Sequence, residues 1–469
     1  MIKNICCIGA GFVGGPTMTV FADRCPHLNV TVVDINEKKI NLWNSNNLDN
    51  LPIFEPGLAE IIRRTRNINL FFSTNIEEAI KQADIVFISV NTPIKTSGIG
   101  AGEASDLKWV ESSARTIAEF AEGHTIVVEK STLPVRTAQV IKEILDNNQI
   151  NKKNINKVNT FSILSNPEFL AEGTALNDLE NPDRVLIGGS DELSINALKD
   201  LYLNWVPIEK IITTSLWSSE LSKLTANAFL AQRISSINSI TAVCEVTGGN
   251  IKQVSKAVGL DSRIGDKFLN PGPGFGGSCF KKDILNLVYL CKYFNLPVVA
   301  NYWDQVIKLN EWQKERIYKK IVEKLFGNLS EKRILILGFA FKANTNDTRE
   351  SAAIQISKDL LNEGASLVFY DPKVTKKQIL DDLYQIDEIK KNSFSKNISF
   401  SNDVYNAAKG SDAIIILTEW AEFKRIDWAM ISTLMRSPSW IFDTRDIVND
   451  NDIKKTSLNY WKLGNAQLD

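Results

Sequence analysis

Histidine is nearly absent from this chain: His27 and His124 are the two histidines among its 469 residues. The six cysteines include no CxxC pair, which argues against a zinc cluster and against a disulfide framework. Basic residues number 54 and acidic residues 55, so no positive field exists to bind a nucleic acid backbone. Acid–base chemistry in this protein therefore falls to side chains other than histidine.

Long apolar runs are missing as well. Uninterrupted apolar stretches, such as Ala413 to Leu417, are far shorter than the roughly 20 residues needed to cross a bilayer. The amino terminus opens on a strand-like run, without the basic segment, apolar core and cleavage site of a secretory signal. We expect a cytoplasmic protein without membrane association, because unpaired thiols suit a reducing compartment. At 44% apolar and 23% charged residues, the composition is that of a globular protein, with length for about three domains.

Two parts of the chain alternate short β-branched runs with longer amphipathic segments, which predicts two doubly wound parallel sheets of the α/β class. Both parts place an acid at the end of the second strand, Asp34 and Asp371, so the chain has a weak internal repeat. The predicted strands are 2–8, 30–34, 85–90, 125–129 and 160–164 in the first part, and 333–337, 367–371, 413–418 and 440–443 in the second.

Between these parts, residues 216–246 contain neither proline nor glycine, and Ser215 and Gly248 bound them as N-cap and stop. This predicts one long helix, followed by further helical segments, that connects the two sheets and makes an oligomer interface. The Asn- and Lys-rich segments 147–159 and 391–402 are predicted as surface loops. The predicted domains are 1–215, 216–326 and 327–469.

A glycine motif, Gly9-Ala10-Gly11-Phe12-Val13-Gly14, follows the first predicted strand and opens a helical pattern. In a dinucleotide fold such glycines permit a tight turn, close approach of the backbone to a pyrophosphate, and close helix packing. Asp34 would accept from the adenosine ribose and repel a 2′-phosphate, which favours NAD over NADP, although Lys38 and Lys39 lie close in sequence. A plain tight turn in a sheet protein is the alternative.

A second glycine-dense segment, from Asn270 to Asp283, feeds another predicted helix. It places Cys279 in the first helical turn, where the helix dipole and Lys281 or Lys282 stabilise the thiolate that a nucleophile requires. Asp283 projects from the same face, four residues further on. The other five cysteines lie in predicted strand or helix interiors, where a cysteine is usually a small buried apolar residue.

Three polar residues of the long predicted helix, Glu220, Lys223 and Asn227, are spaced to share one face. One interpretation is a solvated stripe. The other is a buried lysine and amide that bind a developing oxyanion beside the cysteine.

Polar residues also follow predicted strands elsewhere. Glu168 and Glu172 are compatible with an ordinary helix start or with a carboxylate that activates water. In the second sheet, Lys342, Arg349 and Arg445 lie just past strand ends. They are suited to a phosphate-bearing substrate, because this half lacks the glycine motif, with solvated loops as the alternative.

Taken together, these motifs resemble the UDP-glucose 6-dehydrogenase family of nucleotide-sugar dehydrogenases, over the chain from the first strand to about Arg445. The resemblance implies a four-electron oxidation of the C6 alcohol of UDP-glucose to a carboxylate, with two NAD and one water. Cys279 would capture the C6 aldehyde as a thiohemiacetal, and a second hydride transfer would give a thioester for hydrolysis. The implied fold is two Rossmann-like doubly wound parallel-sheet domains joined by a long central helix and helical connector.

Further roles follow from the resemblance, position by position. Asp283 and Lys223, with a bound water, would manage the alcohol proton, while Lys223 and Asn227 stabilise the oxyanion. Glu168 would assist acid–base steps and thioester hydrolysis, with Thr132 nearby. The implied cofactor contacts are Gly9, Gly11, Phe12, Val13, Gly14, Asp34, Lys39, Val90, Asn91, Thr92, Pro93, Ser131, Thr132, Glu172 and Arg349. The implied sugar-nucleotide contacts are Glu168, Phe169, Leu170, Lys223, Asn227, Arg263, Phe268, Leu269, Gly276, Phe341, Lys342 and Arg445; no metal is implied.

Arg263 resembles a residue that reaches into the site of a partner subunit, so a homodimer would be the smallest active unit, and eukaryotic-type members commonly form hexamers. Three alternatives stay open. Dehydrogenases of GDP-mannose, UDP-N-acetylglucosamine or UDP-N-acetylmannosamine share the cysteine segment. A one-step hydroxyacid dehydrogenase would need no thiol, and a nucleotide-sensing protein would bind NAD without turnover.

Overall fold

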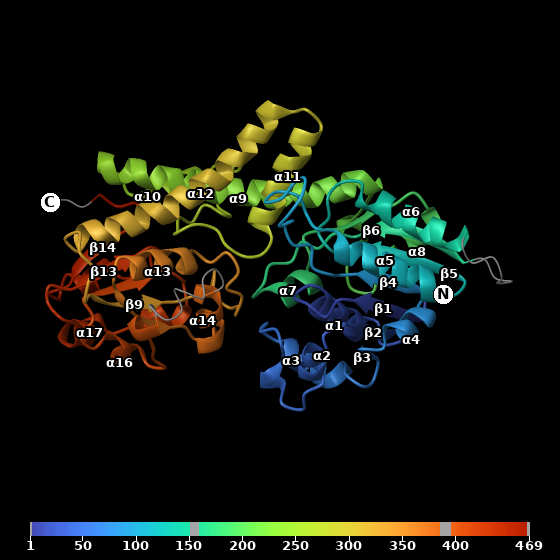
Figure 1. The fold of residues 1–469 in the computed structure, drawn as a ribbon, viewed down its shortest axis with the longest axis horizontal. Helices are drawn as coiled ribbons and strands as arrows, with labels where there is room; N and C mark the ends of the chain where they lie inside the picture. The colour runs from blue at the N-terminus through green and yellow to red at the C-terminus, as the bar shows by residue number, and fades with distance from the viewer. Residues whose placement is uncertain (1, 151–158, 385–394, 467–469) are drawn as a thin grey trace. The chain divides into compact units, whose positions relative to one another are not determined.

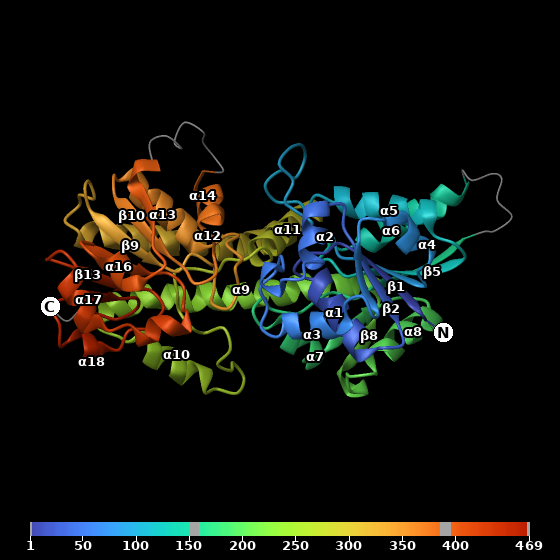
Figure 2. The same ribbon diagram turned by 90° about the horizontal axis from the view of Figure 1, so that it is seen from below.

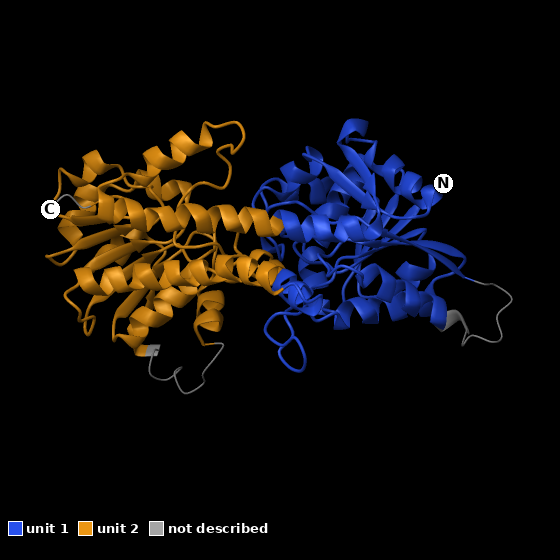
Figure 3. Cartoon of the chain, turned by 90° about the horizontal axis from the view of Figure 1, so that it is seen from above, with its two compact units in different colours: residues 1–226, 285–296 blue, residues 227–284, 297–469 orange. Residues whose placement is uncertain are grey.

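The structure is a computed structural model that describes residues 2–150, 159–384 and 395–466. Parts of the segments predicted as surface loops, 151–158 and 391–394, lie outside the described residues. The chain forms two compact units, blue and orange in Figure 3. The first unit comprises Met1–Ala226 and Leu285–Leu296, and the second comprises Asn227–Ile284 and Pro297–Asp469.

An eight-stranded sheet forms the centre of the first unit, in the order β3-β2-β1-β4-β5-β6-β7-β8 (Figure 1). Its neighbours run parallel, except that β6 and β7 meet antiparallel at the pair Ser165 and Gly188. The order reverses between β1 and β4, and such a reversal opens a ligand crevice at the carboxyl ends of the strands. The strands are β1 Asn4–Ile8, β2 Asn29–Val33, β3 Leu70–Ser73, β4 Ile85–Ile88, β5 His124–Glu129, β6 Thr160–Ser165, β7 Val185–Gly188 and β8 Ile211–Thr214.

Both faces of this sheet are buried. Successive residues of β1 alternate between two cores, with Ile5 and Cys7 in one and Cys6 and Ile8 in the other. Helices α1, α2, α3, α7 and α8 cover the first core, and α4, α5 and α6 cover the second (Figure 2). Their bounds are α1 Gly14–Arg24, α2 Glu37–Trp43, α3 Leu58–Thr65, α4 Ile76–Lys81, α5 Lys108–Phe120, α6 Thr137–Ile150, α7 Ala175–Glu180 and α8 Glu192–Tyr202.

The second unit repeats this topology with a six-stranded parallel sheet, in the order β11-β10-β9-β12-β13-β14. The repeat extends to hydrogen bonds: Asp34 Oδ2 accepts from the backbone N–H of Ala10, and Asp371 Oδ2 accepts from those of Phe339 and Ala340. The elements are β9 Arg333–Leu337, β10 Ser366–Tyr370, β11 Ile398–Phe400, β12 Ala413–Ile416, β13 Trp440–Asp443 and β14 Asn459–Lys462, with α13 Ala352–Asn362, α14 Lys376–Tyr384, α16 Val404–Ala408, α17 Trp428–Leu434 and α18 Asp450–Ile453.

The predicted long helix is present as α9, Leu216–Thr247. Ser215 caps it, since its Oγ accepts from the backbone N–H of Ser218 at 3.3 Å, and Gly248 ends it with a φ of 83°. Three further helices follow: α10 Ile251–Gly259, α11 Phe280–Tyr293 and α12 Pro297–Lys324. Among the residues that the structure describes, no helix is long and apolar enough to span a membrane.

Five strands were not predicted: β3, β7, β8, β11 and β14. They have three or four residues each and lie at or near sheet edges, where the periodic apolar signal is short. β11 corrects the prediction that residues 391–402 form a loop, and α6 likewise extends to Ile150, into the predicted loop 147–159. Neither correction affects the carboxyl ends of β1 and β4, where the glycine motif lies.

Candidate active site

The glycine motif has the backbone of a pyrophosphate-binding turn. Gly9 has a φ of 113°, and an added Cβ there would overlap Ser89 O, while one at Gly14 would overlap Gly9 O. At Gly11 an added Cβ would have no neighbour within 4 Å. The helix that follows, α1, has neither a side-chain cap nor an acidic residue in its first turn. Its N-terminus is therefore suited to an anion.

Asp34 is held ready to accept further hydrogen bonds. Its Oδ2 accepts from the backbone N–H of Ala10 at 3.0 Å and from Lys39 Nζ at 2.9 Å, and its Oδ1 accepts from the N–H of Asn36. Burial alone would raise the pKa of Asp34, but these partners together lower it below its ordinary value. The residues present thus fit NAD: a cradle of glycines for the pyrophosphate and an ionised carboxylate for the ribose.

We expect Gly11→Ala to weaken NAD binding without unfolding the protein. The space beside Gly11 holds no protein atom, so the methyl group should leave the melting temperature unchanged and should block only a ligand that approaches the backbone. Calorimetric titration with NAD and thermal melting of the variant and the wild type check this. Unchanged NAD affinity would place the pyrophosphate elsewhere.

Two predicted cofactor segments are bonded to one another at the carboxyl ends of β4 and β5. Ser131 Oγ donates to Val90 O at 2.7 Å, and Thr92 Oγ1 donates to Thr132 O at 3.1 Å. The structure thereby brings residues 90–93 together with 131 and 132, as the prediction of one cofactor site requires.

The segment that carries Glu168 and Glu172 is anchored by a residue that the sequence did not single out. The buried carboxylate of Glu55 accepts from the backbone N–H of Gly173 at 2.5 Å and from that of Ala175 at 3.2 Å. Glu55 caps the start of α7 from more than 100 residues away, so no local pattern could have revealed it.

Glu168 itself forms an ion pair with a buried lysine that the sequence did not single out either. Its Oε2 lies 2.7 Å from Lys130 Nζ, and its Oε1 accepts from the backbone N–H groups of Phe169 and Leu170. The carboxylate is therefore held in one orientation.

Of the two interpretations of the polar stripe on α9, the solvated one is wrong, because Glu220, Lys223 and Asn227 are all buried. Lys223 Nζ lies 5.3 Å from the ring centroid of Phe169. Glu220 accepts from the backbone N–H groups that begin α6 and faces the buried Glu129, and burial raises the pKa of both carboxyls. A buried lysine has lost hydration and is suited to binding a developing negative charge.

Cys279, in the second unit, is the one cysteine among the six of the chain that is not buried. It immediately precedes α11, and its carbonyl oxygen accepts from the N–H of Asp283 at 2.9 Å, so it caps the helix rather than lying in the first turn as predicted. Burial raises the pKa of Cys6 to about 12 and that of Cys25, which follows α1 rather than lying inside it, to about 11. Exposure and its place at the start of a helix distinguish Cys279 from the other five cysteines.

Asp283 and Asn227 form a buried pair one turn beyond the cysteine. Asn227 Nδ2 donates to Asp283 Oδ2 at 2.5 Å, and the Asp283 residue is 1% exposed. Lys282 Nζ lies 3.7 Å from the other carboxylate oxygen. The structure thus joins three predicted site residues, Cys279, Asp283 and Asn227, within one unit.

Buried amides of α9 and α12 hold the glycine segment before the cysteine. Gly272 donates its N–H to Asn238 Oδ1, and its carbonyl accepts from Gln313 Nε2. Asn310 makes two hydrogen bonds to the backbone of Phe275, at 2.8 and 3.2 Å. Sequence reasoning missed these amides, since amides on helices give no signal of their own.

Three of the predicted sugar-nucleotide residues, Gly276, Phe341 and Arg445, lie together near the carboxyl ends of β9 and β13. Arg445 donates to Leu417 O and to Phe341 O, at 2.9 and 3.1 Å. Gly276 is required here, because an added Cβ would lie 2.7 Å from Glu350 O. The second sheet therefore has a crevice position equivalent to that of the first, with Phe341 and Arg445 in place of the glycine motif.

Three further predicted residues have different surroundings. Arg349 lies in the second unit, apart from the other predicted cofactor residues, and forms a bidentate ion pair with Asp347. Phe268 adopts a φ of 62° next to the buried Leu269, and Arg263 is exposed and pairs with Asp261.

Comparison with known proteins decides the identity of this arrangement. Three models of the UDP-glucose/GDP-mannose dehydrogenase family match in order: the NAD binding domain at residues 3–206, the central domain at 217–312 and the UDP binding domain at 335–450. The chain belongs to the UDP-glucose/GDP-mannose dehydrogenase family. The predicted family, the predicted cofactor NAD and the oxidoreductase class are confirmed.

Relatives over nearly the whole length agree with this membership. UDP-glucose 6-dehydrogenase of Gallus gallus is 55% identical over 96% of this chain and 90% of that protein, and the enzyme of that name from Drosophila melanogaster is 54% identical over 98% and 96%. A solved UDP-glucose dehydrogenase from Pyrobaculum islandicum superimposes with a TM-score of 0.83 at 28% identity, covering 99% of this chain and 98% of that one. The predicted architecture of two parallel sheets with long intervening helices is likewise confirmed.

Proposed function

We propose that this family member oxidises the C6 alcohol of UDP-glucose to the carboxylate of UDP-glucuronate, using two NAD and one water. The observation that carries the proposal is Cys279, a free and accessible thiol at the start of α11, with the buried Asp283–Asn227 pair one turn away. Support for the activity comes from the chicken and fruit-fly relatives, which bear the name UDP-glucose 6-dehydrogenase.

The thiol makes two oxidations possible without release of the intermediate. Bound NAD accepts one hydride in each oxidation. After the first, the Cys279 sulfur adds to the C6 aldehyde: the thiol proton leaves to a base, an S–C bond forms, and the carbonyl electron pair moves to oxygen, which takes a proton to give the thiohemiacetal hydroxyl. Loss of the hydroxyl proton and the second hydride restores the carbonyl as a thioester. Water then adds, the C–S bond breaks, and the acid leaves with the thiol regenerated.

The other catalytic side chains follow from their chemistry. Asp283 accepts the alcohol proton through a bound water, and Lys223 and Asn227 stabilise the oxyanion of the tetrahedral intermediates. Glu168, with Thr132 nearby, orients the hydrolytic water.

Binding residues divide between the two ligands. For NAD we propose the glycine motif with Phe12 and Val13, Asp34 with Lys39, residues 90–93, Ser131, Thr132, Glu172 and Arg349. For the sugar nucleotide we propose Glu168, Phe169, Leu170, Lys223, Asn227, Arg263, Phe268, Leu269, Gly276, Phe341, Lys342 and Arg445. The functional division into 1–215, 216–326 and 327–469 assigns NAD to the first part and UDP to the last.

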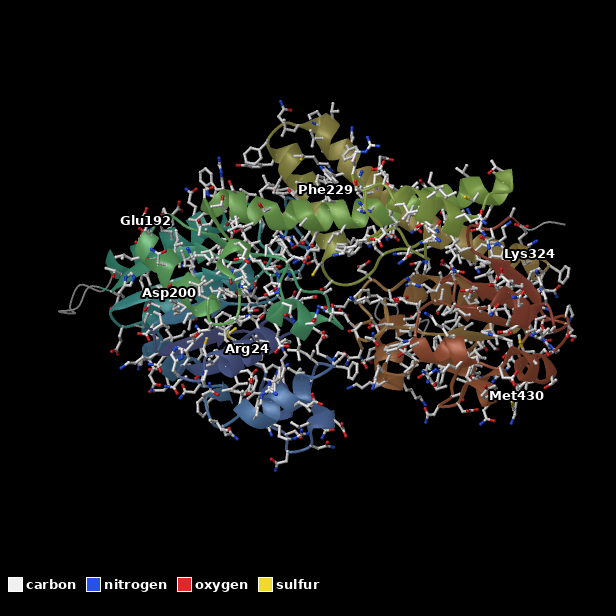
Figure 4. All side chains as sticks on the ribbon, turned by 180° about the vertical axis from the view of Figure 1, so that it is seen from behind. Arg24, Glu192, Asp200, Phe229, Lys324 and Met430 are labelled. Carbon is white, nitrogen blue, oxygen red and sulfur yellow. The ribbon has the colours of Figure 1, made fainter. Side chains whose placement is uncertain are left out.

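A homo-oligomer is part of this proposal. Helix α9 carries exposed apolar residues that suit a partner surface, among them Phe229, labelled in Figure 4 and 54% exposed, and Val246. The side chain of Arg263 is exposed and would reach a partner's site by exchanging its Asp261 contact, so we propose a homodimer as the smallest active unit, with assembly to a hexamer. Six free thiols suit the reducing cytoplasm, where we place the enzyme.

We expect two NADH for each UDP-glucose consumed, measured by absorbance at saturating NAD. Hydrolysis acts on a thioester and not on an aldehyde, and formation of the thioester from the alcohol requires two hydride transfers. GDP-mannose, UDP-N-acetylglucosamine and UDP-N-acetylmannosamine, assayed in parallel, test the alternative substrates. One NADH per sugar would contradict the thioester route, and NAD binding without turnover on any sugar nucleotide would favour a sensor.

A further inference from the structure

A buried lysine pairs with Glu168 in the first unit. Lys130 is 3% exposed and stands directly after β5. Its Nζ lies 2.7 Å from Glu168 Oε2, 3.1 Å from Asn166 Oδ1 and 3.2 Å from the hydroxyl of Tyr202. Two of the N–H donors of the ammonium group bond to Asn166 and Tyr202, and Glu168 is held at ion-pair distance.

The partners of Lys130 are fixed in turn. The Tyr202 hydroxyl donates to Asn166 Oδ1 at 2.6 Å, and Asn166 Nδ2 donates to Leu186 O at 2.8 Å. Lys130, Asn166 and Tyr202 are all buried, whereas the Glu168 side chain keeps 13% of its surface exposed. Glu168 is thus the one member of this network whose side chain is partly exposed.

Stability alone does not account for this arrangement. A buried ion pair is often no more stabilising than apolar side chains of similar volume, because both charges lose their hydration. Burial alone would lower the pKa of Lys130, but Glu168 and Tyr202 raise it well above its ordinary value, so the lysine stays charged. The network thus maintains a permanent positive charge beside a candidate catalytic carboxylate.

We infer that Lys130 is a positioning residue for the reaction: its ammonium group holds the Glu168 carboxylate in the orientation that positions the water that hydrolyses the thioester. The inference rests on the proposed function. The backbone N–H groups of Phe169 and Leu170 hold one carboxylate oxygen and Lys130 holds the other, so the carboxylate cannot rotate. Other charged groups packed on this segment are Arg184 and Lys223, which lie 3.8 and 5.3 Å from the ring centroid of Phe169.

Lys130→Met tests the inference, since it keeps the length of the side chain and removes the charge. Without the cation, burial favours the protonated carboxyl, so the acidic limb of the kcat profile should move about one to three pH units higher. Near neutral pH, hydrolysis should become rate-limiting. A burst of two NADH per active site would then precede slow turnover, and mass spectrometry would find the thioester on the peptide that contains Cys279.

Three further variants separate positioning from folding. Lys130→Arg keeps the charge and should retain the wild-type acidic limb. Tyr202→Phe removes one acceptor but leaves the ion pair, so it should also retain that limb. In a Glu168→Gln background, adding Lys130→Met should change neither kcat nor the pH profile, because the lysine acts through that carboxylate. This double variant buries no unpaired charge. If Lys130→Met alone fails to fold, the double variant still tests whether Lys130 acts through Glu168.

Two results would overturn the inference: an acidic limb that does not move in a folded Lys130→Met enzyme, or a double variant slower than Glu168→Gln alone. If the wild-type enzyme forms two NADH per UDP-glucose, either of these results leaves the proposed function intact. One NADH per sugar in the wild type overturns both.

Discussion

Replacing Cys279 by serine is expected to abolish formation of UDP-glucuronate. Cys279 is the one cysteine of the chain that is not buried, and it lies at the N-terminus of α11. A serine hydroxyl is far less acidic and forms an oxygen ester rather than a thioester. We therefore expect turnover to the acid to fall on the order of 10³-fold or more, the scale that follows loss of a covalent nucleophile.

The measurement is acid formed and NADH formed per UDP-glucose, in the wild type and the variant. Cys291→Ser, a buried cysteine of the same helix, is the matched control and should retain the stoichiometry of two NADH. NAD affinity should be unchanged in both variants, because neither residue belongs to the glycine motif. A Cys279→Ser enzyme with wild-type turnover would exclude the thioester and favour a single-step dehydrogenase.

Replacing Asp283 by asparagine is expected to lower kcat by about 10²- to 10⁴-fold, the usual contribution of a general acid or base. The amide has nearly the same shape, and its oxygen can still accept from Asn227 Nδ2, so the buried contact survives. What is lost is the negative charge and the ability to take a proton from the substrate alcohol. Binding of UDP-glucose should therefore change little.

Steady-state kinetics and thermal melting test this expectation. Asp304→Asn is the matched control, since Asp304 forms a surface ion pair with Lys308 on α12 and should show wild-type kcat. A primary isotope effect with C6-deuterated UDP-glucose reports whether the first oxidation has become slow. If Asp283→Asn melts at a lower temperature but keeps its kcat, the carboxylate is a structural partner of Asn227 and takes no proton.

The sequence predicted those parts of the fold and of the site that rest on local spacing. Local patterns, each within about 25 residues, carried these predictions: glycines at the first, third and sixth positions after a strand, an acid at the next strand end, and a cysteine before a helix. The structure agrees on the strands of both sheet centres and on α9 to within one residue of its predicted end. The catalytic and binding roles of the residues stay predictions until the variants are measured.

Burial was harder to predict than position. Glu220, Lys223 and Asn227 share one face of α9 as their spacing requires, but whether that face is solvated depends on what packs against it. A stripe of three polar residues is more often solvated, and here the contacts of α9 with the sheet and with α11 bury it. The periodicity of a helix carries no information on its neighbours.

What the sequence determined by itself is therefore the chemistry of the chain: a nucleotide loop, a nucleophilic thiol, an internal repeat and a family. The tertiary structure alone decided how the chemical groups are held. Lys130 meets Glu168 from 38 residues away, Glu55 caps α7 from more than 100, and the amides of α9 and α12 fix the segment before Cys279. Such contacts join residues with no common period, because a parallel sheet brings the ends of distant strands to one edge while the chain between them forms helices.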